Sequence, residues 1–172
     1  MTAKILDGKA LAETIRGEVA TGVAEMQQNH GITPGLAAIL VGDDPASAIY
    51  VRNKRRACDE VGMVSDTLLL PADSTNEQVL ECVQRLNDDP RFHGILVQLP
   101  LPPQVDERLI MESLDPGKDV DGLHPFNVGK LVQGRADFVP GTPAGIQQIL
   151  LRNQRQQRNG QIVCHQASTS SS

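Results

Sequence analysis

The sequence predicts an α/β domain with a three-layer βαβαβ arrangement, in which a mainly parallel sheet lies between two helical layers. Three short apolar runs, each long enough for one strand, alternate with longer segments whose apolar residues recur at helical spacing. Apolar runs of this kind are typical of parallel strands, because helices cover both faces of such a sheet. Aromatic residues make up only 2% of the chain, so the core is expected to be aliphatic.

The first half of this pattern begins with a helix over residues 8–29, where apolar residues recur every three or four positions and Gly31 is placed to end the helix. The run LAAILVG (36–42) predicts a buried strand, closed by Gly-Asp-Asp-Pro. Pro45 is tolerated in the first turn of a helix, so a second helix is expected from there to about Val61.

The next repeat of strand and helix follows directly. MVSDTLLL (63–70) predicts the second strand. Ser74 and Glu77 have the spacing of a capping box, which predicts a helix that runs to about Asn87. HGILVQL (93–99) predicts the third strand. Ligands of such folds bind beyond the carboxyl ends of the strands. Gln98 and the prolines that follow it lie at such an end.

The second half of the chain has a weaker pattern. Residues 100–142 are rich in Pro, Gly and Asp and are expected to be mostly loop, with a short helix near 105–112. Thr142 is placed to cap one more helix, with the sequence TPAGIQQILLR. From Asn153 onward the sequence is polar without period and then of low complexity, which predicts a disordered or non-native tail.

Charge and composition argue against several classes of protein. The net charge of -5 includes no domain-wide basic excess, which disfavours nucleic acid as the main partner. No apolar run approaches the roughly 20 residues of a membrane span. The first residues lack the apolar core of a secretory signal. Cys58, Cys82 and Cys164 have no metal-ligand spacing, so reduced thiols in a cytosolic protein are expected.

Tyr50 and Lys54 are the first candidate site residues. They are four residues apart, so on a helix they share one face. A lysine can act as a base where burial or a nearby cation lowers its pKa, and a tyrosine beside it offers a flat surface for stacking. The pair is equally compatible with a surface lysine beside a half-buried tyrosine, an arrangement that is common on amphipathic helices.

Polar residues near the third strand are further candidates. Gln98 interrupts an apolar run, so its amide either bonds loop backbone or reaches into a cleft toward Lys54 or a substrate. Asp119 and Asp121 are two apart and face the same way in an extended chain. They are compatible with metal ligation, with a turn, or with recognition of a ligand's N–H groups. His124, alone in a loop, more often satisfies a loop hydrogen bond than performs chemistry.

Taken in order, these segments closely resemble the bifunctional methylenetetrahydrofolate dehydrogenase/cyclohydrolase family, also called the FolD family. The resemblance runs from about Ile5 to Leu151. The motifs that carry it are ASAIYVRNKRRACDEVGM, GILVQLPLP, PGKDVDGLHPFNVGKL and PGTPAGI. Several ordered matches at these separations favour a functional site at Tyr50 and Lys54 over a plain surface pair.

The resemblance implies specific roles for residues of this chain. Lys54 matches the catalytic lysine, Tyr50 the tyrosine that packs on the folate, and Gln98 the glutamine that interacts with that lysine. Asp121 matches the aspartate that binds the pterin ring. Leu99 and Pro100, which follow Gln98, are expected to contact the substrate as well. The basic run RNKRR (52–56) is either a solvated helix face or an anchor for an acidic ligand tail.

The resemblance also implies an activity in one-carbon metabolism. Family members oxidise 5,10-methylene-tetrahydrofolate with NADP, or with NAD in some members. They then hydrolyse the methenyl product to 10-formyl-tetrahydrofolate, which links them to purine biosynthesis. They use no metal, are cytoplasmic and are usually homodimers. The methenyl intermediate is a cation, which favours the neutral form of a nearby lysine.

The resemblance implies a truncated domain organisation. Residues 1–140 are expected to form the folate-binding catalytic domain, 141–152 the start of a linker helix, and 153–172 the tail. Family members continue into a second, Rossmann-like domain whose glycine-rich turn holds the cofactor phosphates. This sequence has no such turn, so no cofactor-binding residue is expected here, the dehydrogenase step is expected to be absent, and a homodimer is doubtful.

Two substitutions depart from the family's pattern, and one alternative stays open. Gly141 stands where members usually have cysteine, and Arg56 where they have a further lysine. Neither removes a catalytic group. The alternative to an active domain is a non-catalytic folate-binding fragment or a poorly folded remnant of a broken gene.

Overall fold

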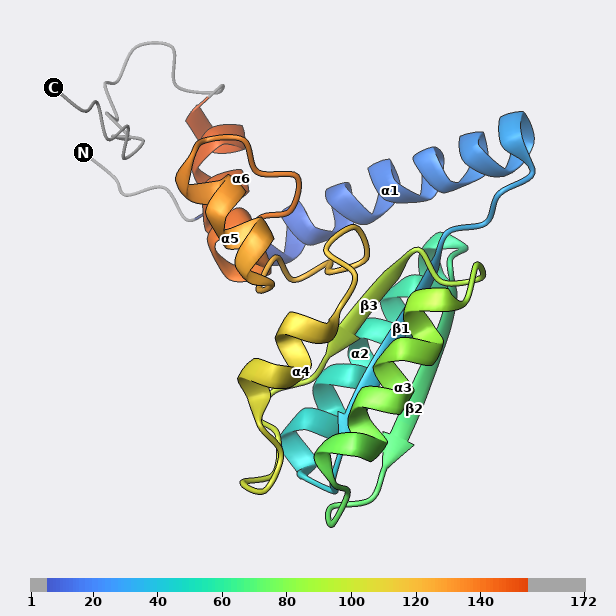
Figure 1. The fold of residues 1–172 in the computed structure, drawn as a ribbon. Coiled ribbons are helices and arrows are strands. Elements are labelled where there is room, and N and C mark those ends of the chain that lie inside the picture. Colours follow the sequence, from blue (N-terminus) through green and yellow to red (C-terminus); the bar gives the residue numbers. More distant parts are fainter. Residues whose placement is uncertain (1–5, 155–172) are drawn as a thin grey trace, which may run out of the picture.

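The computed structural model describes residues 6–154 and shows an α/β domain with a short C-terminal helical extension (Figure 1). In chain order the elements are α1 (Gly8–His30), β1 (Gly35–Val41), α2 (Pro45–Val61), β2 (Val64–Leu70), α3 (Asn76–Asp88), β3 (Gly94–Val97), α4 (Glu107–Ser113), α5 (Pro125–Val132) and α6 (Gly141–Gln154). No helix among the described residues is long and apolar enough to cross a membrane.

The sheet has three strands in the order β2-β1-β3, and both pairings are parallel, as the alternation of strands and helices predicts. Ile39 of the central strand lies opposite Leu68 of β2 and Val97 of β3. The third strand ends earlier than predicted, at Val97, so Gln98 follows the strand instead of interrupting it. The backbone N–H of Gln98 still donates to the Ile39 carbonyl at 2.9 Å, which continues the direction of the strand.

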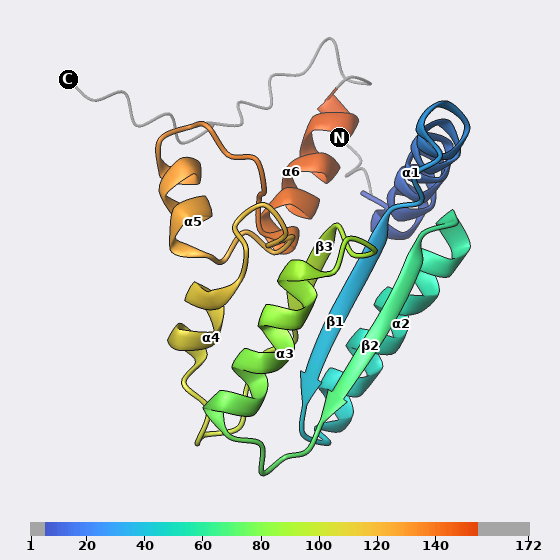
Figure 2. The same ribbon diagram turned by 45° about the vertical axis from the view of Figure 1, so that its right-hand side comes forward.

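Helices cover both faces of this sheet, which gives the predicted three layers (Figures 1 and 2). Alternate residues of β1 point to opposite faces. Ala37, Ile39 and Val41 join the larger buried cluster with side chains of α3 and α4. Ala38 and Leu40 join a smaller buried cluster on the α2 side. Both clusters are mainly aliphatic, as expected from the scarcity of aromatic residues, and the larger one also contains Phe92.

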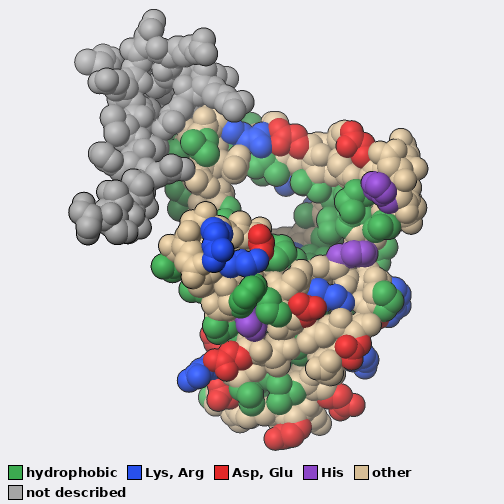
Figure 3. All heavy atoms as spheres, turned by 45° about the horizontal axis from the view of Figure 1, so that its top comes forward, with side chains coloured by type: hydrophobic (Ala, Val, Ile, Leu, Met, Phe, Trp, Pro, Cys, Tyr) green, Lys and Arg blue, Asp and Glu red, His purple; other side chains and the backbone are tan. Residues whose placement is uncertain are grey.

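The helix α1 packs across the C-terminal end of α2 and also reaches the C-terminal extension. Arg16 lies 3.7 Å from the Glu60 carboxylate of α2, and Arg152 of α6 donates to Glu18 of α1 at 2.7 Å. A space-filling view shows an opening between this helix and the sheet layers (Figure 3). The start and end of the described chain are therefore brought together by contact between α1 and α6.

The capping box of α3 lies one residue later than predicted. Thr75 is the N-cap and Gln78 its partner, with the Thr75 N–H donating to the Gln78 side chain at 2.9 Å. The prediction of Ser74 and Glu77 is wrong because two overlapping Ser/Thr-x-x-Glu/Gln patterns occur here. The buried Ser74 hydroxyl instead donates to the Pro71 carbonyl and closes the preceding turn.

Two features of the second half also differ from prediction. Residues 125–132, expected as loop, form α5, whose first turn begins at Pro125 and whose N-cap is His124. The helix α6 begins at Gly141, so Thr142 is inside it and not its cap, and it continues to Gln154. The short helix near 105–112 is present as α4, with Asp106 as its N-cap. The predicted tail beyond residue 154 lies outside the described residues.

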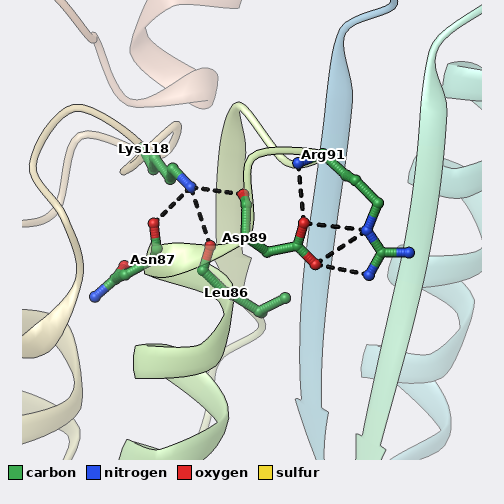
Figure 4. A network of polar contacts seen from close by, with 5 residues as sticks. All are labelled: Leu86, Asn87, Asp89, Arg91 and Lys118. Carbon is green, nitrogen blue, oxygen red and sulfur yellow. Dashed lines mark hydrogen bonds and ion pairs between the residues drawn. The ribbon is translucent and has the colours of Figure 1, made fainter.

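The loop after α4 is tied to the end of α3 by one lysine (Figure 4). Lys118 Nζ donates to the carbonyls of Asn87 at 2.7 Å, Asp89 at 2.9 Å and Leu86 at 3.1 Å. These are carbonyls at the C-terminal end of a helix, where a positive charge is also favoured by the helix dipole. In the same network, hydrogen bonds from Arg91 hold the pKa of Asp89 at about 2.

Replacing Lys118 is expected to destabilise the domain. The variant Lys118→Met keeps the aliphatic stem and leaves three helix-end carbonyls without their charged donor, so unfolding should become easier by about 1.5–3 kcal/mol. Urea denaturation measures the change. Lys9→Met, at an exposed lysine at the start of α1, is the matched control because it removes the same charge. Equal stability of the two variants would contradict a structural role for the Lys118 contacts.

Candidate functional site

The candidate residues are placed by the smaller apolar cluster on the α2 side of the sheet. Val51 of α2 and Leu96 of β3 are buried in this cluster, and Val120 packs against it. Each of the three apolar residues lies close in the chain to a candidate polar residue. Val51 follows Tyr50 directly and comes three residues before Lys54. Leu96 comes two residues before Gln98, and Val120 directly before Asp121. Packing of the three apolar side chains therefore brings three separate segments to one face of the domain.

Tyr50 and Lys54 both lie on α2, as predicted. The helix begins with Pro45 in its first turn, and the Asp44 carboxylate caps it by accepting from the Ser47 N–H at 2.7 Å. The Tyr50 side chain is 62% exposed, and Lys54 is half-buried. Lys54 also lines a narrow crevice between α2 and the strands β1 and β2. The tyrosine thus offers a free ring surface next to a partly shielded ammonium group.

Gln98 takes the first of the two possibilities that the sequence leaves open, because its amide bonds loop backbone. Its Nε2 donates to the Leu99 carbonyl at 2.7 Å, which satisfies one end of the amide on loop backbone. Its Oε1 is buried and has no hydrogen-bond partner. No hydrogen bond joins Gln98 and Lys54 in the described part of the chain. A buried acceptor without a partner costs free energy, so Oε1 is suited to accept from a lysine or a ligand.

Leu99 and Pro100 follow at the carboxyl end of β3, the predicted position for ligand contacts. Leu99 is half-buried, Pro100 is exposed, and the peptide bond between them is cis. The next residue, Leu101, packs against the larger core cluster and fixes the chain there. The two residues are therefore presented at the strand end by a segment that is anchored on both sides.

Asp119 and Asp121 do not face the same way, because the chain is not extended here. It turns after Asp119, with the Gly122 N–H donating to the Asp119 carbonyl at 3.3 Å. Gly122 has φ 66°, and a Cβ at this position would lie 3.1 Å from the Phe138 carbonyl oxygen, so a glycine is required. The Asp119 carboxylate accordingly turns inward, toward the start of α5, while Asp121 is left on the α2 side.

Asp121 is close enough to Lys54 for their charges to interact. Burial raises the pKa of the Asp121 carboxyl above its usual value; the positive charge of Lys54 opposes this shift, and the negative charge of Asp119 adds to it. The structure therefore brings together an exposed aromatic ring, an ammonium group and a partly buried carboxyl. Sequence spacing alone does not reveal the charge interaction between Lys54 and Asp121, which lie in separate segments.

Two residues with structural roles near the site were missed by reasoning from the sequence. Lys118 anchors the loop that carries Asp121, and Asn127 is buried and bonds the Asp119 carboxylate at 2.9 Å. Both stand within the motif PGKDVDGLHPFNVGKL, yet neither has a local pattern that identifies its partner. His124 forms the loop hydrogen bond that was expected, since its Nδ1 accepts from the Phe126 N–H at 3.0 Å.

Residues 6–154 contain no group of three His, Cys, Asp or Glu side chains that could hold a metal ion. Cys58 and Cys82 are buried free thiols, and burial raises the pKa of each.

Comparisons with known proteins agree with this fold. Residues 6–121 match the family model described as tetrahydrofolate dehydrogenase/cyclohydrolase, catalytic domain. "Bifunctional protein FolD 2" of Geobacter sulfurreducens is 53% identical over 148 residues, which are 86% of this chain and 52% of that protein. "Bifunctional protein FolD" of Methanosarcina mazei is 52% identical over 143 residues, with 83% and 50% covered.

Solved structures of FolD enzymes share this fold. The FolD enzyme of Campylobacter jejuni superposes with a TM-score of 0.85 at 43% identity, over 88% of this chain and 54% of that one. The enzyme of Trypanosoma brucei, "complexed with NADP cofactor and inhibitor", has a TM-score of 0.85 at 37% identity, over 90% and 53%. The fold and the matched family model thus define an α/β domain of the kind that this family uses as its catalytic domain. The chain belongs to the tetrahydrofolate dehydrogenase/cyclohydrolase family, and it spans about half the length of the relatives it matches.

The raised pKa of Asp121 predicts a pH dependence of stability. Because the folded state holds this proton more tightly than the unfolded state, the contribution of Asp121 to stability is present below the ordinary aspartate pKa. It is lost as the pH rises through the raised value. Asp121→Asn removes this titration. The stability of the variant should therefore rise relative to wild type between acidic and neutral pH, as measured by urea denaturation across that range.

Asp73→Asn, at an exposed aspartate, provides the matched control for that measurement. If the curves of Asp121→Asn and wild type stay parallel over the whole pH range, the shift at Asp121 is absent.

Proposed function

We propose that this chain forms the folate-binding side of a methylenetetrahydrofolate dehydrogenase/cyclohydrolase active site. In the whole protein, that site oxidises 5,10-methylene-tetrahydrofolate with NADP and hydrolyses 5,10-methenyl-tetrahydrofolate to 10-formyl-tetrahydrofolate. The observation that carries the proposal is the approach of Asp121 to Lys54 beside the free ring of Tyr50. The description of similar solved structures as dehydrogenase and cyclohydrolase enzymes supports it.

Each side chain has a role that its surroundings support. The exposed ring of Tyr50 stacks on the flat pterin. Asp121 accepts hydrogen bonds from pterin N–H groups, which are stronger when the acceptor is charged. Leu99 and Pro100 line the substrate at the end of β3. Gln98 uses its unpartnered Oε1 to accept from the Lys54 ammonium or from the substrate.

Lys54 is the proposed acid–base group of the hydrolysis. The methenyl substrate carries a positive charge, so its binding disfavours the ammonium form of a lysine nearby. A neutral Lys54 can then accept a proton from the water that attacks the methenyl carbon. The same side chain can return this proton to the folate nitrogen that leaves as the ring opens. The other proton of the water, which remains on the hydroxyl of the tetrahedral intermediate, passes to solvent as the formyl C=O forms. The hydrolysis of the cation therefore releases one proton overall.

The place where many α/β folds bind a dinucleotide does not fit the phosphates here. The turn from β1 to α2, where such phosphates bind in many α/β folds, contains Asp43 and Asp44, and the Asp44 carboxylate already accepts from the Ser47 N–H. Two carboxylates at this helix start would repel a pyrophosphate. We therefore assign no dehydrogenase step to residues 6–154, and the NADP site of the whole protein is proposed to lie elsewhere.

The wider proposals follow from family membership. Residues 1–140 are proposed as the catalytic domain, with 141–152 as the start of a linker helix and 153–172 as a tail. The whole protein is proposed to act without a metal, as a cytoplasmic homodimer that supplies one-carbon units, including those for purine biosynthesis.

Folate binding is the first test of this function. Tetrahydrofolate at about 100 times its Kd should raise the melting temperature of the chain by roughly 5–10 °C. Tyr50→Ala should abolish most of this rise, because it removes the stacking surface. Leu69→Ala is the matched control, since Leu69 is 70% exposed on β2, away from the cluster that places the site. A cooperative melt that tetrahydrofolate does not move would refute the folate site, and a chain without a cooperative transition would be a poorly folded remnant.

Activity is the second test. A polypeptide of these 172 residues should not reduce NADP with methylene-tetrahydrofolate, because a hydride needs an acceptor held against the folate. Any hydrolysis of methenyl-tetrahydrofolate should fall by a factor of about 10²–10⁴ in Lys54→Met, with folate binding retained. NADP reduction above background would refute the first expectation, and unchanged hydrolysis the second. Folate binding without any hydrolysis would identify a non-catalytic folate-binding fragment.

A further inference from the structure

Asp119 is the most deeply buried charged side chain of the described residues and has no role in the mechanism above. Its side chain is 1% exposed. One carboxylate oxygen, Oδ2, accepts from the His124 N–H at 2.8 Å and from Asn127 Nδ2 at 2.9 Å. The other, Oδ1, is buried and has no partner. Asn127, itself 2% exposed, also donates to the Pro116 carbonyl at 2.9 Å and so holds the carboxylate against the loop.

The hydrogen bonds of Asp119 do not by themselves require a charge. The amide oxygen of an asparagine could accept from the same two donors. Burying a carboxylate costs several kcal/mol more than burying a neutral amide, unless a charged partner compensates for it. The two donors here are a backbone N–H and a neutral amide, and no ion pair involves Asp119 within residues 6–154. The fold therefore carries a buried negative charge that its own hydrogen bonding does not need.

The negative charge of Asp119 acts on the carboxyl of Asp121, two residues further on. Asp119 and Lys54 are the two charged groups that act on the Asp121 carboxyl, and Asp119 favours its protonated form while Lys54 opposes it. A carboxylate with a greater affinity for protons is a stronger acceptor of hydrogen bonds. The arrangement places this effect on the group that is proposed to bind the pterin N–H groups.

We propose that Asp119 is a positioning residue for folate binding, whose buried charge, held by Asn127 and the His124 amide, makes Asp121 a stronger hydrogen-bond acceptor for the pterin. The inference rests on the proposed function, since it assumes that Asp121 contacts the folate. It also assigns different tasks to the two aspartates of the KDVDG segment. Asp119 supplies a fixed negative charge from inside, and Asp121 makes the contact.

The test compares Asp119→Asn with Asn127→Ala. NMR titration of the Asp121 side chain in the folate-free chain measures its pKa, and calorimetry measures the Kd for tetrahydrofolate. In Asp119→Asn, the pKa of Asp121 should fall, tetrahydrofolate should bind about three- to tenfold more weakly, and the melting temperature at neutral pH should be unchanged or higher. Asn127→Ala keeps the charge, so it should lower the melting temperature and leave the pKa of Asp121 raised.

Every other outcome counts against the inference. If the two variants change the pKa of Asp121 alike, or if neither changes it, then Asp119 has only a structural role. If Asp119→Asn does not fold, then the fold itself needs the charge and the inference is wrong. If the pKa falls as expected but wild-type chain does not bind tetrahydrofolate, then the proposed function fails and the role in binding fails with it, whereas the coupling of the two aspartates stands.

Discussion

The candidate site depends on one apolar contact, in which Val51, Leu96 and Val120 pack together over the α2 side of the sheet. Full burial of an aliphatic side chain of this size contributes roughly 1.5–3 kcal/mol. The buried Val51 and Leu96, with the partly buried Val120, can therefore fix a helix, a strand and a loop relative to one another. Because apolar packing holds the segments in place, the polar groups beside them need not bond each other. Gln98 Oε1 accordingly has no hydrogen-bond partner among the described residues.

The loop that carries Asp121 needs more support than this contact, because it has little regular structure. It is held at three places. The Lys118 ammonium donates to carbonyls at the end of α3, and the Ile95 N–H of β3 donates to the Lys118 backbone carbonyl at 2.7 Å. The Asn127 side chain donates to the Asp119 carboxylate. These anchors belong to the sheet and to helices on either side of the loop. The position of Asp121 is consequently determined by the rigid part of the domain.

The sequence predicts most of the fold and only part of the site. Helical periodicity and short apolar runs predict α1, α2 and the parallel sheet, because these signals are local. The capping box of α3 is displaced by one residue, since Ser74 and Thr75 offer equivalent local patterns and only the Pro71 turn distinguishes them. The segment 125–132 is read as loop from its glycine and proline content, although Pro125 is well suited to a first helical turn.

For the site, the pair on α2 can be identified from helical spacing, and its meaning comes from resemblance to a family. The approach of Asp121 to Lys54 and the bond from Asn127 to Asp119 depend on tertiary packing, for which the sequence has no local signal. The expectation that Asp119 and Asp121 face the same way is wrong because it assumes an extended chain. The turn at Gly122 gives the two carboxylates different surroundings.

Tyr50 has an optical consequence. It is the single tyrosine of the chain, and the chain has no tryptophan, so all tyrosine emission comes from the proposed folate-stacking position. The ring is already largely in water in the folded state, so its emission should change little when the protein unfolds. Stacking against another flat ring should quench it. The fluorescence of Tyr50 should therefore report occupancy of the site and be nearly insensitive to folding.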